Sequence, residues 1–342
     1  MFFGVLPLFY GAPLPDGITR PLTMALSIMV PFIRSSGLPP FFLYTNGPAH
    51  TSVSLEERKA HIATCSEDWR CRTADLTELM AAKMQQTGAT TWVPEGSFME
   101  ISPNYLHHRA ILQLGVPSFF LPRGDWPGQF KFIGVLPPAQ EPPDGWPNLP
   151  EWWSDVTSAS SEQGKKIVVV AQGTVEVDPH QLIIPTISAL QDRNDVLLVA
   201  ILGRKGARLP PHIQPDVPGN VRVTDFIHYD AILQHAHVWV HNAGYGAVQH
   251  GIAHAVPMVV TAEGQDKPEN ALRVAASGIG VNLGPSTPGP EQVLNAVNQV
   301  LDDTNGFQKR AREVREEAQG FRCFELVEKE ILALVDPYSG TS

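Results

Sequence analysis

The segment His237–Asn270, HVWVHNAGYGAVQHGIAHAVPMVVTAEGQDKPEN, is the most informative part of this chain. Its pattern predicts an apolar strand, a glycine turn, a helix, a second apolar strand and a polar loop. Glycines between a strand and a helix let an anionic ligand approach the backbone, where the free N–H groups of the first helical turn can bind it. The loop after the second strand carries Asp266, Lys267 and Asn270, which are suited to contact hydroxyl groups. This combination favours a nucleotide-linked sugar as the ligand.

Strands and helices alternate around this segment from about residue 165 to the C-terminus. Apolar, β-branched runs predict strands at 166–172, 196–202, 220–224, 237–241, 256–260 and 278–283. Helices are expected at 179–190, 230–235, 246–254, 268–276, 290–302 and 307–334. Pro185 lies inside the first of them, so that helix either kinks there or starts later. Alternation of this kind predicts a parallel, doubly wound sheet with right-handed crossovers, and the fold class is therefore α/β. We expect residues 165–335 to form a complete, Rossmann-like C-terminal domain.

The first 136 residues have a less regular pattern. Strands are expected at 41–46, 90–96, 118–122 and 131–136, and helices at 54–69 and 71–88. Ser54 and Glu57 form a candidate capping box at the start of the first helix. The strand–loop–helix unit that opens a complete α/β domain is not recognisable, so residues 1–136 are interpreted as a partial, truncated Rossmann-like domain. Residues 137–164 are rich in proline, tryptophan and serine, which is typical of a linker between domains.

Composition restricts the class of protein. The chain has 342 residues, 43% hydrophobic residues and a net charge of -10, which argues against nucleic acid or an anionic membrane as a partner. Its cysteines, Cys65, Cys71 and Cys323, lack zinc-type spacing and favour a reducing, cytoplasmic setting, with a Cys65–Cys71 disulfide as the alternative. The apolar stretches at 1–15 and 18–33 are interrupted by proline or glycine and are interpreted as core, with no integral membrane segment.

The chain resembles the UDP-glycosyltransferases of GT-B architecture, a family that includes macrolide-type and fungal sterol-like members. The resemblance is strongest over 168–280 and weaker over 115–153. The family motif has the form H-x-G-x-N-S-x-x-E, followed by G-V-P-M and by an acidic residue with glutamine. This chain carries the corresponding residues Asn242-Ala243-Gly244-Tyr245-Gly246-Ala247, His250, Ala255-Val256-Pro257-Met258 and Asp266-Lys267.

The resemblance implies a donor-binding site. By position, Gly173 and Thr174 would lie near the diphosphate, and Phe226, next to Ile227, would stack on the uracil. The segment Asn242–Ala247, with Gly244, Tyr245 and Gly246, would wrap the diphosphate, and Asp266 with Lys267 would face the sugar hydroxyls. The phosphate-binding histidine of the family aligns with Asn242, next to His241. Its ribose-binding glutamate aligns with His250, so Gln249 or another residue would bind the ribose, and Lys267 replaces the family's glutamine.

Inverting glycosyl transfer also requires a base that deprotonates the acceptor. The family's base is a histidine that follows the first strand of the N-terminal domain, and this chain is expected to begin inside that domain. The available histidines, His50, His61, His107 and His108, do not follow such a strand, so the catalytic residues stay unknown. No D-x-D run indicates a metal. His250 and His254 lie four apart on a helix and imitate a metal-binding pair, but we interpret one as packed and the other as a surface residue.

Three functions compete on this basis. The first is transfer of a hexose from a UDP-sugar, with UDP-glucose favoured, to a lipophilic hydroxyl such as that of a sterol or polyketide in secondary metabolism, with inversion. The UDP-sugar would be a co-substrate, and no cofactor is expected. The second is a non-catalytic donor-binding remnant, or a subunit that a partner chain completes. The third is an NAD(P)-dependent oxidoreductase, since Gly244-x-Gly246 follows a strand and Glu263 comes soon after; Gln249 at the third glycine position opposes it.

Overall fold

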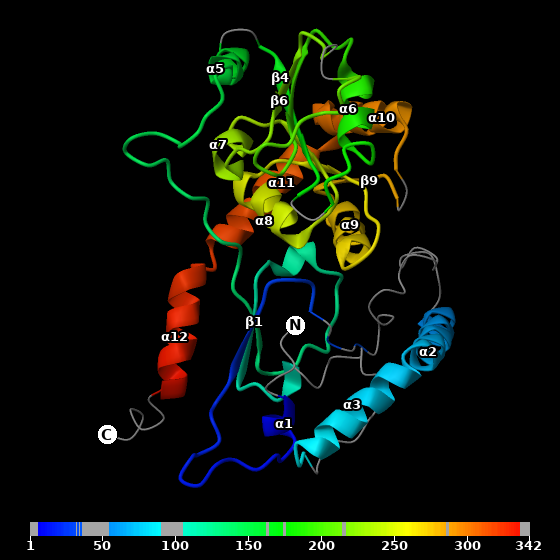
Figure 1. The fold of residues 1–342 in the computed structure, drawn as a ribbon, viewed down its shortest axis with the longest axis vertical. Coiled ribbons are helices and arrows are strands. Elements are labelled where there is room, and N and C mark those ends of the chain that lie inside the picture. Colours follow the sequence, from blue (N-terminus) through cyan, green and yellow to red (C-terminus); the bar gives the residue numbers. More distant parts are fainter. Residues whose placement is uncertain are drawn as a thin grey trace. The chain divides into compact units, whose positions relative to one another are not determined.

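The computed structural model describes residues 6–31, 33, 35, 55–89, 105–161, 164–173, 176–213, 217–284 and 287–335 (Figure 1). The chain divides into two compact units. The first unit comprises Met1–Gln113, Pro122–Phe132 and Phe324–Ser342, and the second comprises Leu114–Leu121 and Ile133–Cys323. These bounds differ from the predicted ones at the C-terminus, because the last helix groups with the first unit.

A six-stranded parallel sheet forms the centre of the second unit. Its strand order is β6-β5-β4-β7-β8-β9. The strands are β4 (Lys166–Ala171), β5 (Val196–Ile201), β6 (Val221–Thr224), β7 (Val238–His241), β8 (Met258–Val260) and β9 (Gly280–Asn282). The strand order reverses between β4 and β7, which is the topological switch point of a doubly wound fold. The α/β fold class and all six predicted strands of this region are confirmed.

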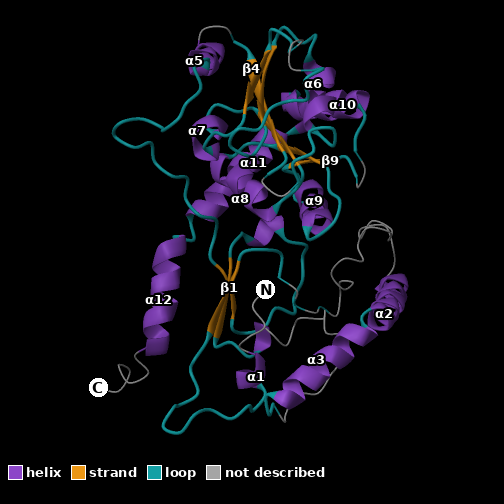
Figure 2. Ribbon diagram, in the orientation of Figure 1, coloured by secondary structure: helices purple, strands orange, loops and turns teal. Residues whose placement is uncertain are grey.

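Helices cover both faces of this sheet (Figure 2). They are α5 (Trp153–Ser161), α6 (Ile183–Leu190), α7 (Tyr229–Leu233), α8 (Tyr245–His254), α9 (Lys267–Ala276), α10 (Pro290–Leu301) and α11 (Phe307–Gln319). All six residues of β5 are buried, as expected for a strand with helices on both sides. One core combines apolar side chains of α6 and α10 with those of the central strands, including Ile187, Val297 and Val170. On α8, Val248 and Ile252 are almost fully buried.

Several predicted helix bounds in this unit need correction. The helix expected at 179–190 starts only at Ile183, which places Pro185 in its first turn, where a missing N–H is tolerated. The helix expected at 307–334 is two helices, α11 and α12 (Cys323–Val335). Arg322, between them, has a φ of 47°, a left-handed conformation that interrupts helical geometry.

The predicted linker is partly helical, because α5 lies inside it. Asp155 on this helix accepts a hydrogen bond from Arg222 Nε on β6 at 2.6 Å. Trp146 is 8% exposed, and its ring lies 4.8 Å from that of His228. Trp153 lies edge-on to His235 at 5.7 Å. The linker therefore packs on the second unit through these two tryptophans.

The first unit contains a parallel sheet of order β1-β2-β3. Its strands are β1 (Met24–Ser27), β2 (Ala110–Gln113) and β3 (Phe130–Phe132), and its helices include α1 (Leu6–Phe9), α2 (Leu55–Arg72), α3 (Ala74–Gln86) and α12. The predicted helices correspond to α2 and α3, but β1 and β2 were not predicted. The segment 131–136 contributes only the end of β3. The predicted strands at 41–46 and 90–96, and Ser54 of the capping box, lie outside the described residues.

The strand expected at 118–122 is wrong. Residues 118–121 belong to the second unit, and the segment starts inside a short 3-10 helix, η3 (Pro117–Phe119), whose first residue is a proline. None of the described helices has the length and apolar character needed to cross a membrane. Cys71 and Cys323 are free thiols, so the alternative Cys65–Cys71 disulfide is not formed.

Candidate donor-binding site

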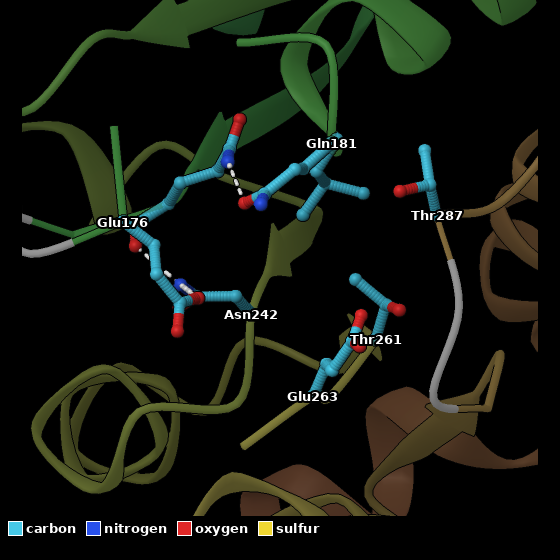
Figure 3. Close-up of a pocket in the computed structure, with 8 residues that line it drawn as sticks. Glu176, Gln181, Asn242, Thr261, Glu263 and Thr287 are labelled. Carbon is cyan, nitrogen blue, oxygen red and sulfur yellow. Dashed lines mark hydrogen bonds between the residues drawn. The ribbon is translucent and has the colours of Figure 1, made fainter. Parts of the chain in front are cut away.

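A pocket of about 120 Å³ opens at the carboxyl ends of β4, β7 and β8 (Figure 3). Its lining residues are Gln172, Glu176, Gln181, Leu182, Asn242, Thr261, Glu263 and Thr287. All of them except Leu182 are polar. The pocket includes residues that follow β4 and β7, the two strands of the switch point, where open α/β sheets bind their ligands.

Glu176 is the centre of the polar contacts in this pocket. Asn242 Nδ2 donates to Glu176 Oε2 at 3.0 Å, and the two side chains point toward one another in Figure 3. The ammonium group of Lys267, whose side chain is 7% exposed, forms an ion pair with the same carboxylate. An amide and a buried ammonium are groups that also bind phosphate. In this structure the Glu176 carboxylate is the partner of both the Asn242 amide and the Lys267 ammonium.

The N-terminus of α8 follows the pocket residue Asn242 by two residues. Gly244 is the N-cap, and among the described residues no side chain caps the helix. Gly246 is exposed, and a Cβ built on it meets no heavy atom within 4 Å. The first-turn N–H groups of a ten-residue helix without a side-chain cap are available to an anion. The predicted glycine turn therefore has the geometry of an anion-binding site.

Tyr245 and Ala247 have structural roles in the same turn. The Tyr245 hydroxyl donates to the carbonyl of Leu114, and the side chain is 5% exposed. The Ala247 carbonyl accepts from Trp239 Nε1 at 3.1 Å. Both contacts hold the start of α8 in place within the second unit.

His241 is buried at the end of β7, with 1% of its surface exposed. Its Nδ1 accepts a hydrogen bond from the N–H of Ala243 at 3.1 Å, which requires the neutral ring. Burial lowers the pKa of His241 to about 3. Ala243 has a φ of 55°, so the imidazole stabilises a strained turn directly before α8.

The loop after β8 is tied to this turn. Asn270 Nδ2 donates to the carbonyl of Ala243 at 2.9 Å and to Asp266 Oδ2 at 3.1 Å. Through Asn270, Asp266 and the start of α9 are held close to the glycine turn. Neither Asp266 nor Lys267 lines the pocket, since Asp266 contacts Asn270 and Lys267 contacts Glu176.

The remaining predicted residues after β4 and β6 have different environments. Gly173 follows β4 with a φ of 86°, and a Cβ on Gly203 would lie 2.0 Å from its carbonyl oxygen. Thr174 lies outside the described residues. Phe226 is 44% exposed after β6 and is open to stacking, whereas Ile227 is 4% exposed and belongs to the core.

His250 and Gln249, the candidates for ribose contact, do not line the pocket. His250 Nδ1 lies 3.1 Å from Asp230 Oδ1, and its ring meets that of Tyr229 edge-on. Burial lowers the pKa of His250. Burial also acts to raise the pKa of the Asp230 carboxyl, but hydrogen bonds from His254 and the Ala139 N–H outweigh it and lower this pKa. The Gln249 amide is buried without a hydrogen-bond partner among the described residues.

Most of the pocket lining was not predicted from the sequence. Gln172 directly follows β4 and Thr261 directly follows β8, so their positions after buried strands were a usable signal. Glu176, Gln181 and Thr287 come from loops whose course the sequence did not reveal. Glu263, considered only for an oxidoreductase, lies in the pocket.

The histidines considered as a base give no assignment. His107 stacks on Phe9 with ring centroids 5.4 Å apart, and His108 meets the same ring edge-on at 4.9 Å. His50 and the side chain of His61 lie outside the described residues. The catalytic base therefore stays unassigned.

Comparisons with known proteins agree with this geometry. Residues 205–334 match the family described as erythromycin biosynthesis protein CIII-like, C-terminal domain. The chain is 37% identical over 338 residues to UDP-glucosyltransferase 1 of Beauveria bassiana, covering 97% of this chain and 69% of that protein. It is 34% identical over 334 residues to UDP-glucosyltransferase avaP of Aspergillus versicolor, covering 95% and 66%. A solved structure, the glycotransferase of kitacinnamycin, aligns with a TM-score of 0.59 at 23% identity, over 82% of this chain and 67% of the other.

The similarity to the solved structure shows only the fold, which is that of GT-B nucleotide-sugar glycosyltransferases. The match to the fungal relatives extends over nearly the whole chain and shows the family: this chain belongs to the UDP-glycosyltransferase family of enzymes. The comparisons favour neither the donor-binding remnant nor the oxidoreductase, and they give no support to a partner chain.

Proposed function

We propose that the second unit binds a UDP-sugar, with UDP-glucose first, and that the enzyme transfers the hexose with inversion to a lipophilic hydroxyl. The uncapped N-terminus of α8 beside the switch-point pocket carries this proposal. The fungal relatives in the comparison are named UDP-glucosyltransferases, which supports UDP-glucose as the donor.

The arrangement suits a departing nucleoside diphosphate. The positive end of α8 and the Lys267 ammonium are fixed donors that stabilise the negative charge of the leaving group. A diphosphate that binds there replaces the Glu176 carboxylate as the partner of Lys267 and Asn242. Thr261 and Glu263 at the end of β8 offer a hydroxyl and a carboxylate for the sugar hydroxyls. Phe226 remains the proposed platform for the uracil.

A titration of the folded chain with UDP and UDP-glucose by calorimetry tests the proposal. Gly246→Val adds side-chain atoms where the structure has open space, so it should obstruct the diphosphate without disturbing the core. We expect at least about tenfold weaker UDP binding, a loss of about 1.4 kcal/mol. Gly124→Val is the matched control, because Gly124 is also surrounded by open space but lies in the first unit.

Two further variants locate the sugar. Glu263→Gln and Asp266→Ala should weaken UDP-glucose more than UDP if their carboxylates contact the hexose. A folded wild-type chain that binds neither UDP nor UDP-glucose would contradict the proposed function.

We also propose a cytoplasmic location. The exposed, free thiol of Cys71 supports it, since such thiols persist in a reducing compartment.

A further inference from the structure

A cluster of metal-ligand side chains lies outside the donor-binding pocket. Asp230 of α7 and His250 and His254 of α8 place one ligand atom each within 4.8 Å of one another. The two histidines are four residues apart, so they project from the same face of α8. His250 Nδ1 lies 3.1 Å and His254 Nε2 lies 2.7 Å from Asp230 Oδ1. The sequence analysis had assigned the histidines to different environments; the structure turns both toward one carboxylate.

The carboxylate is positioned by its own contacts. Asp230 is 5% exposed, and its Oδ2 accepts the backbone N–H of Ala139 at 3.0 Å. That bond fixes the plane of the carboxylate and leaves Oδ1 directed at the two imidazoles. The His254 side chain is 8% exposed and that of His250 is 37% exposed, so the cluster has a buried side and an open side.

We infer that Asp230, His250 and His254 form a binding site for a divalent transition-metal ion, with Zn²⁺ the best match. Imidazole nitrogen and carboxylate oxygen are the ligands that zinc takes at about 2.0–2.2 Å, which places neighbouring ligand atoms of a tetrahedron roughly 3.3 Å apart. The separations of 3.1 Å and 2.7 Å between ligand atoms are close to that spacing. All three ligand atoms lie within 4.8 Å of one another, and the ion would enter between them as the two rings rotate away from Asp230 Oδ1.

Binding of the ion needs no reactant beyond solvent, because each imidazole keeps one proton. When an imidazole nitrogen that faces Asp230 binds the ion, its proton moves to the other ring nitrogen through solvent. The open side at His250 gives the ion an entry path, and water completes its coordination.

The expected role is a clamp. The ion joins α7 to α8, and through the Ala139 hydrogen bond it also holds the start of the segment that precedes α5. None of its three ligands lines the donor-binding pocket.

Equilibrium dialysis of the metal-free full chain against Zn²⁺, with the bound metal measured by mass spectrometry, tests this inference. We expect one Zn²⁺ per chain and a rise in Tm of about 3 °C at a tenfold excess over Kd. His254→Gln and His250→Gln keep an amide that can hydrogen-bond to Asp230 but is a poor zinc ligand. Each should weaken Zn²⁺ binding at least about tenfold and abolish the rise in Tm.

His235→Gln is the matched control, because this histidine lies two residues after α7 but does not belong to the cluster. It should bind Zn²⁺ as the wild type does. The inference is overturned if the wild type binds no Zn²⁺, or if His250→Gln and His254→Gln bind it as tightly as the wild type. In that case the cluster is held by hydrogen bonds alone.

Discussion

At the scale of single residues, His241 links the pH to the stability of the second unit. Its pKa is about 3 in the folded chain because the ring is buried, and near 6.5 in an unfolded chain. Below pH 6.5 the unfolded chain binds a proton that the folded chain does not, so stability present at pH 7 is lost as the pH falls toward 3. Between pH 7 and pH 5 we expect His241 alone to remove about 2 kcal/mol from the free energy of unfolding.

His241→Asn isolates this contribution. The asparagine Oδ1 can take the place of Nδ1 as the acceptor of the Ala243 N–H, but it does not titrate. Urea unfolding at pH 7 and pH 5 should show a smaller loss in the variant than in the wild type. Equal losses in the two proteins would mean that other groups carry the pH dependence.

At the residue level, the sequence indicated features that depend on the backbone. It placed Gly244 and Gly246 between a strand and a helix, and they lie between β7 and the first turn of α8. Side-chain partners were less accessible, since they depend on tertiary contacts. The sequence did not indicate that Lys267, expected to face a sugar, pairs with Glu176. Nor did it indicate that His250, aligned with the family's ribose contact, lies against Asp230, which is 20 residues away in the sequence.

At the scale of elements, β9 depends on a close approach to β8, its one strand neighbour among the described residues. A Cβ on Gly280 would lie 2.2 Å from the carbonyl oxygen of Met258 and 2.8 Å from Val274 Cγ1. Gly280→Ala therefore forces β9 away from β8 or α9 away from the sheet. We expect it to lower the free energy of unfolding by about 2–3 kcal/mol.

Gly246→Ala is the matched control for this change, because it makes the same exchange in a helix with open space around it. It should alter stability by no more than about 0.5–1 kcal/mol, in the stabilising direction. Urea midpoints of the two variants decide the matter: similar losses in both would show that the β8–β9 approach is not the cause.

Strands were predicted well where burial on both faces produces long apolar runs, as in β4 and β5. The pattern failed where elements are short. The segment 118–122 has apolar residues that favour strands, but Pro117 starts a 3-10 helix, and Phe119 packs against Phe120 and Tyr245. In β2 the polar residue Gln113 interrupts the apolar pattern that predicts a buried strand. Its side chain can be buried because Nε2 donates to the carbonyl of Met29, which is far away in the sequence.

At the scale of the whole molecule, the chain order does not follow the order of the units. Residues from Phe324 onward return to the first unit, where Glu330 on α12 pairs with Lys131 on β3 at 2.5 Å. An exposed pair of this kind contributes little to stability. Gly320, the C-cap of α11, was a usable sequence signal for the end of that helix. The return of α12 to the first unit depends on tertiary contacts and could not be derived from the sequence.

The two units should also respond differently to a ligand, and hydrogen exchange on the intact chain measures this. The amides of β4, β5 and β7 are central in a sheet covered by helices, so they should exchange slowest. Saturating UDP should further slow exchange in 241–249 and 261–263, because it binds the first turn of α8 and orders the pocket. The exchange rates of the amides of β1, β2 and β3, which belong to the other unit, should not change.

Slowing that is uniform over both units would instead indicate that UDP stabilises the chain as one cooperative body. Protection absent from 241–249 but present elsewhere would place the nucleotide outside the switch point.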